Sequence, residues 1–281
     1  MKPPDLDRFR ILSGPRLHPT QDFTVFSVSR ANLEKDRYDS SLWIADSGDV
    51  RELAGVSRVS SPEWSRDGSK LGLLMKVPDD PEAVDDDAER HPQLAILDDP
   101  RGGGAPRVLT KFPLGVSKFK WSPDGWTILV AAAEYADSWA NLSVKDRGKQ
   151  PRRITQVPWR FDAASTWDDR RTVTALIDVT GQQEPRRIDI GNFVDIADIA
   201  WHPDGSRFVV LAERAHADRT RLEQVVLEVD AASGDVKPRH VDGSWTEVHF
   251  TGSRLIAIGL PAVYDWPAPY TLYEIKADGT P

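Results

Sequence analysis

The chain has 281 residues with a formal net charge of −8 at pH 7, and 40% of its residues are hydrophobic. This composition is typical of a globular protein, and the excess of acidic residues argues against a nucleic-acid partner, because phosphate contacts need clustered Lys and Arg. The sequence contains no cysteine, which excludes disulfides, thiolate zinc sites and cysteine nucleophiles.

The amino-terminal segment predicts a cytoplasmic protein. Residues 1–7 include a Lys but no apolar stretch of the kind that a secretion signal needs. No apolar run approaches the roughly 18 residues of a membrane-spanning helix, and the longest runs, such as residues 128–133, have the size of a strand. We therefore expect no membrane partner.

One short motif recurs along the chain. Trp64, Trp121 and Trp201 each precede a turn that contains Asp-Gly, and residues 17–22 are a degraded copy of the same motif. In such turns Gly accepts a positive φ, and a Pro earlier in the turn fixes its own φ at a value that suits the turn. Apolar strands are expected directly after the turns, at residues 70–77, 127–133 and 207–212. Because the three Trp share one repeat position, we expect them to fill the space between neighbouring sheets.

Two further strands complete each repeat. The third strand ends on acidic residues, at 42–46, 93–98 and 225–230, and the fourth is short and basic at its start, at 106–110 and 151–155. Four short strands separated by turn residues are the signature of a propeller blade, and helical periodicity is nearly absent. The sequence therefore predicts an all-β protein, a β-propeller of about six four-stranded blades in a single domain, residues 1–281.

The spacing of the motifs sets the expected blade boundaries. The separation in sequence between Trp121 and Trp201 is about twice the ~40–45 residues of one propeller blade. A blade without the motif is therefore expected between them, built on strands at 172–179 and 185–188. The six expected blades are residues 10–55, 56–112, 113–157, 158–192, 193–242 and 243–281.

Metal sites are not expected. The six His residues show no spacing typical of metal ligands, and they are His18, His91, His202, His216, His240 and His249. The run Asp85–Asp87, inside an acidic loop at 78–92, lacks the alternating oxygens and the glycine of a calcium loop. We interpret the His as structural or surface residues and the acidic run as a solvated loop, and we expect no metal and no cofactor.

Two segments carry a resemblance to a known family. Residues 34–43, together with Trp159-Arg160-Phe161-Asp162 and the following Asp168-Asp169-Arg170-Arg171, resemble landmarks of the propellers that are attached to acylaminoacyl peptidases, in the prolyl oligopeptidase family of serine peptidases. The resemblance covers essentially the whole chain and includes the related dipeptidyl-peptidase-like branch. One departure is visible, because the family usually follows Phe-Asp with Gly-x-Gly, whereas Ala163-Ala164-Ser165 stand here.

The best candidate for substrate contact is the group Trp159, Arg160, Phe161 and Asp162. An Arg beside two aromatic residues can hold a carboxylate or a peptide carbonyl through its planar donors. The alternative is structural, with Arg160 and Asp162 forming a clamp at the crossover between the third and fourth expected blades. Trp167 and Trp266 also lie outside the repeat position, although packing explains them as well.

A catalytic centre is not expected within these residues. The nucleophile elbow Gly-x-Ser-x-Gly of an α/β-hydrolase is absent, and the nearest string, Gly68–Gly72, has the wrong spacing and begins in a repeat turn. The resemblance therefore implies a non-catalytic propeller that shields an active site and admits short peptides when it is joined to a hydrolase domain. That hydrolase domain is expected either in cis or to have been lost. A free-standing protein-interaction platform is the alternative, because fold does not imply function. A propeller lactonase or glycosidase would need metal ligands or paired carboxylates on several blades, and no such position recurs.

The number of blades bears on association. Six blades are recognisable, the resemblance implies seven, and the last expected strand is 270–275. We therefore expect either an open ring with a gap between the first and last blades or an unusual six-blade closure. Because an open ring leaves apolar strand faces in water, self-association is expected.

Overall fold

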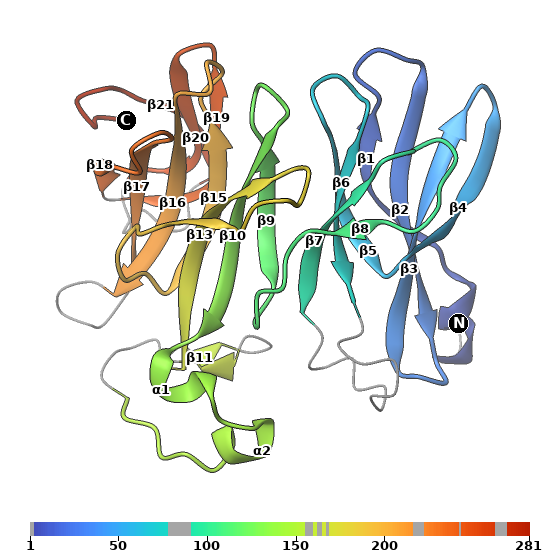
Figure 1. Cartoon of the computed structure of the whole chain (residues 1–281), viewed down its shortest axis with the longest axis horizontal. Helices are drawn as coiled ribbons and strands as arrows, with labels where there is room; N and C mark the ends of the chain where they lie inside the picture. Colours follow the sequence, from blue (N-terminus) through green and yellow to red (C-terminus); the bar gives the residue numbers. More distant parts are fainter. Residues whose placement is uncertain are drawn as a thin grey trace. The chain divides into compact units, whose positions relative to one another are not determined.

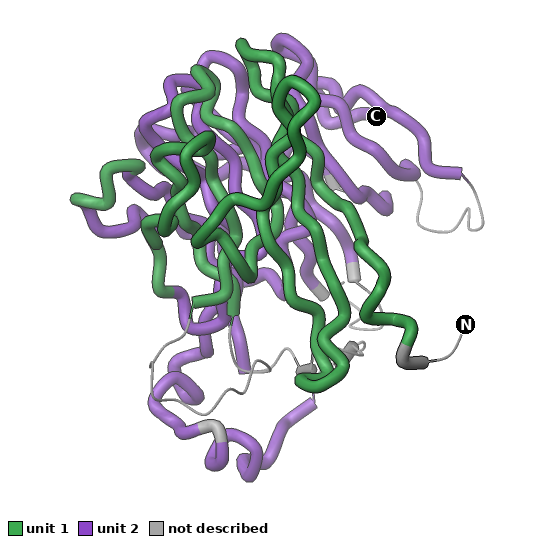
Figure 2. Tube along the Cα trace, turned by 90° about the vertical axis from the view of Figure 1, so that its right-hand side faces the viewer, with its two compact units in different colours: residues 1–111, 179–182 green, residues 112–178, 183–281 purple. Residues whose placement is uncertain are grey.

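The computed structural model describes residues 3–77, 91–154, 160–161, 165–166, 169–215, 222–241, 243–261 and 269–281. The chain forms two compact units, shown in Figure 2: unit 1 contains residues 1–111 and 179–182, and unit 2 contains residues 112–178 and 183–281. In both units the strands of each sheet pair antiparallel in chain order, with β11 and β12 forming a separate hairpin between β10 and β13, as Figure 1 shows.

Unit 1 holds two four-stranded sheets and a 3-10 helix at Pro3–Arg8. The first sheet consists of β1 (Ile11–Leu17), β2 (Phe23–Asn32), β3 (Arg37–Asp46) and β4 (Asp49–Ser57), and the second of β5 (Val59–Trp64), β6 (Leu71–Lys76), β7 (Pro92–Leu97) and β8 (Arg107–Val108). Alternate residues of β2 and β3, such as Val25 and Ile44, are buried in one cluster with Leu71 and Leu73 of β6. This period-2 burial packs the two sheets face to face.

Unit 2 holds two four-stranded sheets and one three-stranded sheet, besides a two-stranded hairpin. They consist of β9 (Val116–Trp121), β10 (Thr127–Tyr135), β13 (Arg170–Asp178) and β14 (Arg186–Ile188); of β15 (Asp195–Trp201), β16 (Arg207–Ala215), β17 (Leu222–Asp230) and β18 (Val236–Val241); and of β19 (Ser244–Thr251), β20 (Arg254–Leu260) and β21 (Thr271–Ile275). One apolar cluster joins the first of these sheets to the second, and another joins the second to the third.

Two of the three recurring Trp residues, Trp64 and Trp201, lie between neighbouring sheets, as the repeat predicts. Trp64 ends β5, and its Nε1 donates to the carbonyl oxygen of Arg16 in β1 at 3.1 Å. Trp201 ends β15, and its Nε1 donates to the carbonyl oxygen of Lys120 in β9 at 3.2 Å. In both cases the indole therefore reaches from the first strand of one sheet to the first strand of the preceding sheet.

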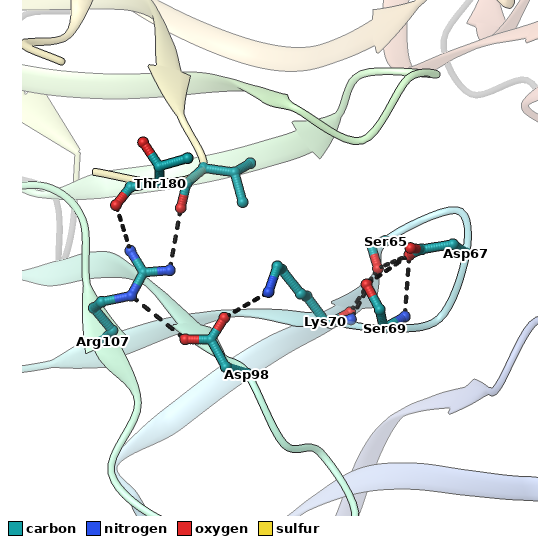
Figure 3. Close-up of polar contacts among 8 residues, drawn as sticks. Ser65, Asp67, Ser69, Lys70, Asp98, Arg107 and Thr180 are labelled. Carbon is teal, nitrogen blue, oxygen red and sulfur yellow. Dashed lines mark hydrogen bonds and ion pairs between the residues drawn. The ribbon is translucent and has the colours of Figure 1, made fainter. Parts of the chain in front are cut away.

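The turn after each Trp is closed by its Asp side chain. In unit 1, Ser65 Oγ and Ser69 Oγ donate to Asp67 Oδ1 at 2.7 and 2.9 Å, as Figure 3 shows. The same figure shows Arg107 of β8, which donates to Asp98 and to the carbonyl oxygen of Thr180 and so holds the turn 179–182 within unit 1. Gly68 of the turn has a φ of +75°, and a Cβ there would lie 2.4 Å from the ring of His18, so this position requires glycine.

The predicted division between blades 113–157 and 158–192 is wrong. β10 pairs directly with β13 along its whole length, so the strand expected to belong to a motif-free blade is the third strand of the sheet that begins at β9. Residues 151–154, expected as a fourth strand, are irregular, and β14 takes that position. The physical reason is that no aromatic-ended first strand precedes β13. The described residues consequently form five sheets of three or four strands rather than six blades.

Candidate functional site at the base of the 136–169 segment

The segment between β10 and β13 contains the predicted substrate-contact motif. It includes α1 (Asp137–Ala140), α2 (Val144–Arg147) and a short hairpin of β11 (Arg160–Phe161) and β12 (Ser165–Thr166). Arg160 and Phe161 form β11, whereas Trp159 and Asp162 lie outside the described residues. Substrate contact by the four residues stays a prediction. The segment connects two paired strands of one sheet, so it is not at a crossover between two blades.

A buried aspartate joins the two ends of this segment. Asp169 accepts a hydrogen bond from Arg152 Nη2 at 2.8 Å, and its carbonyl oxygen accepts the backbone N–H of Ala136 at 2.9 Å. The Arg152 guanidinium also lies over the ring of the buried Trp139, 4.5 Å from its centroid. The Asp-Arg-Arg landmark therefore acts here as the anchor at which the segment leaves and re-enters the sheet.

A second buried carboxylate lies beside this anchor. Glu134 of β10 accepts Arg171 Nε of β13 on one oxygen at 2.7 Å and Arg187 Nη1 of β14 on the other at 2.8 Å. Burial of the Glu134 carboxyl disfavours its charged form, but the hydrogen bonds from Arg187 and Arg171 outweigh that effect, and its pKa lies below its ordinary value. One carboxylate thus fixes the positions of two guanidinium groups.

Two cavities adjoin the start of β13. The larger, about 630 Å³, is lined by Glu134 and its two arginines and has an apolar wall that includes Val173, Ile188 and Phe193. The smaller, about 190 Å³, shares Arg171 and Thr172 with the larger cavity and adds residues of β9, β10 and β15. The arrangement is suited to holding a small anionic group beside an apolar surface.

Glu134 and Arg187 were not expected as site residues. Glu134 is the one charged residue of an otherwise largely apolar strand, and Arg187 lies in a stretch expected only as a short strand. The signal available in the sequence was the acidic residue at the end of an apolar run, but its partners become visible only once β10, β13 and β14 are known to be neighbours.

Three of the described His residues are buried. His18 and His202 are buried, and their rings contact Trp64 and Phe250 edge-on at centroid distances of 4.7 and 4.9 Å. His240 is buried beside Trp245. His216 and Asp85–Asp87 lie outside the described residues. In the part of the chain that the structure describes, no group of three or more His, Asp or Glu side chains is placed to hold a metal ion.

The comparisons with known proteins point to peptidases. No protein-family model matches the sequence. A curated relative, "Uncharacterized peptidase YuxL" of Bacillus subtilis (strain 168), is 28% identical over 223 residues, which are 76% of this chain and 31% of that protein. This chain thus spans about a third of the length of that relative.

Solved structures show the same architecture. Acylaminoacyl peptidase of Pyrococcus horikoshii matches with a TM-score of 0.68 and 17% identity over 96% of this chain and 39% of its own. The β-propeller domain of the Trilobed protease from Pyrococcus furiosus, described as having an open velcro topology, matches with a TM-score of 0.59 and 13% identity over 95% of this chain and 69% of its own. These similarities confirm the β-propeller fold and the resemblance to peptidase-associated propellers. None of the described helices has the length and apolar character needed to cross a membrane.

Proposed function

We propose that this chain, a β-propeller similar to those of acylaminoacyl peptidases, acts as the non-catalytic, substrate-gating part of a serine peptidase of the prolyl oligopeptidase family. In this role it shields the active site of a hydrolase domain and admits short peptides. The observation that carries the proposal is the sequence similarity to a peptidase over 76% of this chain but only 31% of that relative.

The 136–169 segment supports this role. Among the described sheets it is the longest segment between two paired strands, and Asp169, Arg152 and Trp139 form contacts at its base. A rigid base with a long extension suits a segment that contacts bound peptides, because binding residues are commonly on loops positioned by a rigid scaffold. The predicted contact motif Trp159–Asp162 belongs to this extension.

The first experiment follows the reading frame that encodes the chain past codon 281. The proposal expects an α/β-hydrolase domain with a Gly-x-Ser-x-Gly elbow in that frame or in an adjacent gene. A stop codon there, with no hydrolase gene adjacent, contradicts the gating role and favours the free-standing interaction platform.

The second experiment measures hydrolysis of N-acylated peptides of increasing length by the product of that complete frame. Gating predicts that kcat/KM falls by about tenfold or more between short peptides and peptides of protein-like length, which corresponds to about 1.4 kcal/mol of barrier. Residues 1–281 alone are expected to hydrolyse none of these substrates, because they contain no nucleophile elbow. A kcat/KM that is independent of peptide length contradicts the proposal.

A further inference from the structure

The sheet of β19, β20 and β21 has a free edge where the four-stranded sheets have their fourth strand. β4, β8, β14 and β18 fill this place in the other sheets, whereas within the described residues β21 pairs with β20 alone. Two contacts with β18 hold the end of β21: Arg239 Nη2 donates to the carbonyl oxygen of Ile275 at 3.0 Å, and the ring of His240 contacts the carbonyl oxygen of Gly279. The edge is therefore fixed in place before a strand joins it.

The turn after β21 directs the backbone along this edge. The N–H of Lys276 donates to the carbonyl oxygen of Thr280 at 2.9 Å, and the N–H of Gly279, whose φ is +82°, donates to the carbonyl oxygen of Lys276 at 3.0 Å. These two bonds are those of a three-residue hairpin loop with a glycine bulge. Because alternate residues of an antiparallel strand bond to the same neighbour, the backbone groups of Leu272 and Glu274 face the same edge as those of Lys276.

The existing fourth strands carry a basic residue at one shared position. In each of the larger sheets one row of paired residues starts at the repeat position, which is Trp201 in the sheet of β15 and Phe250 in the sheet of β19. On the next row every fourth strand contributes a basic residue, and these are Arg51, Arg107, Arg186 and Lys237. Three of them are followed two positions later by an aliphatic residue, at Leu53, Leu109 and Ile188. In the last sheet the same row ends at Glu274 of β21.

The basic residues of the fourth strands have a common role. Their guanidinium groups donate to backbone carbonyl oxygens at the end of the third strand of the following sheet, or in the connection after it, as Figure 3 shows for Arg107 and Thr180. The contacts, at 2.6 to 3.3 Å, join Arg51 to Arg101, Arg107 to Val179 and Thr180, Arg186 to Ala231 and Ala232, and, two residues after Lys237, Arg239 to Ile275. A basic residue on this row is therefore part of how the chain joins its sheets.

The charge at Glu274 is suited to a basic partner. In the preceding sheet Glu228 holds the same position, and its carboxylate contacts Arg207 of the second strand at 3.7 Å and Arg239 of the fourth strand at 2.7 Å. The carboxylate of Glu274 contacts Arg254 of the second strand at 2.8 Å. Within the described residues no fourth strand supplies Glu274 with the second arginine that Glu228 has.

We propose that the free edge of β21 is a docking edge for a strand of the pattern basic-x-aliphatic, and that the polypeptide directly after Pro281 supplies this strand. The basic residue, the first after Pro281, lies opposite Glu274, and the aliphatic residue, the third, lies opposite Leu272, which is 70% exposed. Pro281 supports the assignment, because Pro106 and Pro185 directly precede the basic residue in two of the existing fourth strands. The proposal rests on this edge and does not depend on the gating role.

The test extends the 281-residue chain by Arg-Arg-Ile-Asp-Ile, the sequence of residues 186–190, and measures amide hydrogen exchange. The N–H groups of Leu272 and Glu274 are expected to exchange about tenfold or more slowly in the extended chain than in the parent. A matched extension that begins with Glu instead of Arg is expected to protect them less, because like charges directly opposite each other are destabilising. In Glu274→Gln the two extensions are expected to protect Leu272 equally. Circular dichroism melts confirm that each variant is folded.

The reading frame past codon 281 supplies the second measurement, with Arg or Lys expected directly after Pro281 and an aliphatic residue at the third codon. A stop codon, or no basic residue at the first codon, overturns the assignment of the occupant. Unchanged exchange of Leu272 and Glu274 in the arginine extension overturns the docking edge, and equal protection by both extensions in the parent background overturns the role of Glu274. Protection in the parent that is lost on dilution assigns the edge to a second copy and also overturns the proposal. A hydrolase domain in a frame without the basic residue contradicts this proposal alone.

Discussion

The two neighbouring sheets that begin at β9 and β15 share one frame and differ in one connection. In both sheets the second and third strands pair residue by residue over their whole lengths, from Thr127↔Asp178 to Tyr135↔Arg170 and from Arg207↔Asp230 to Ala215↔Leu222. The first sheet inserts residues 136–169 between these strands, whereas the second inserts only residues 216–221.

The comparison teaches where this fold can acquire a site. The register of the strands is set by their buried alternate residues, such as Leu129 and Ala131 in β10 and Phe208 and Val210 in β16. Because these side chains are buried by contacts between the sheets themselves, a long segment between the second and third strands leaves the strand pairing and the packing of the sheets unchanged. Arg187, the buried Asp169 and the cavities all lie at the base of this segment.

The largest effect is expected from the shared frame. Trp201→Ala removes an indole that packs between the two sheets and hydrogen-bonds Lys120, and it is expected to lower the free energy of unfolding by about 3–5 kcal/mol. Trp126→Ala, at a side chain that is 66% exposed, is expected to change it by about 0.5 kcal/mol or less. Urea unfolding followed by circular dichroism measures both, and equal losses would show that the repeated Trp is not a frame residue.

The glutamates of the two sheets are expected to respond in opposite directions. Glu134→Gln leaves Arg171 and Arg187 without their shared anion and is expected to destabilise the protein by about 1–2 kcal/mol at pH 7, since the arginines are half exposed. Glu213 of β16 has a raised pKa because burial disfavours its charged form. Glu213→Gln is therefore expected to stabilise the protein by about 1 kcal/mol or less. Changes of the same sign in the two variants would contradict the comparison.

The pH dependence of stability separates the same two residues. The lowered pKa of Glu134 means that its contribution is complete above its ordinary value of 4.5 and is lost as the pH falls through the lower folded pKa. The raised pKa of Glu213 means that its contribution is present below 4.5 and is lost as the pH rises through the higher folded pKa. The melting temperature of the parent should fall as the pH is lowered through this range, and this fall should be smaller in Glu134→Gln. At neutral pH the melting temperature of Glu213→Gln should be higher than that of the parent. Parallel profiles for parent and variants would contradict both assignments.

The smallest effect concerns association through the first sheet. β1 exposes Ile11, Leu12 and Leu17, with Leu12 64% exposed, and we propose that this apolar strand supports self-association of the 281-residue chain. Leu12→Ser with Leu17→Ser is expected to reduce the mass measured by light scattering after size exclusion at a given concentration. A monomeric parent chain would contradict this proposal.

The sequence predicted most of the frame because the frame repeats. The Trp and Asp-Gly positions located the first turn of three of the sheets, and the apolar runs located the strands β6, β10 and β16 to within a few residues. The blade boundary at 157–158 failed because spacing alone cannot distinguish a blade without the motif from a long insertion in one blade. A missing third strand after β10 was the signal, since residues 136–154 contain no strand-like apolar run.

The candidate site was predicted at Trp159–Asp162, and Asp168–Arg171 served only as a landmark of the resemblance. Glu134 and Arg187 were not predicted, because they come from strands distant in sequence. Which side chains meet across a sheet depends on the strand pairing and its register. When one strand partner is predicted wrongly, these contacts cannot be predicted.

The most direct test of this account asks whether β10 pairs with β13. Because the chain has no cysteine, disulfides can be introduced without background, at the register partners Ala133→Cys with Thr172→Cys and Ala132→Cys with Val173→Cys. Opposed residues of an antiparallel pair are close enough for a disulfide, most favourably at the non-hydrogen-bonded pairs. The account predicts that at least one of these two variants forms an intramolecular disulfide in high yield. The off-register pair Ala133→Cys with Val173→Cys points to opposite faces and is expected to form none. Absence of the bond in both matched pairs, in folded protein, would contradict a single sheet interrupted by residues 136–169.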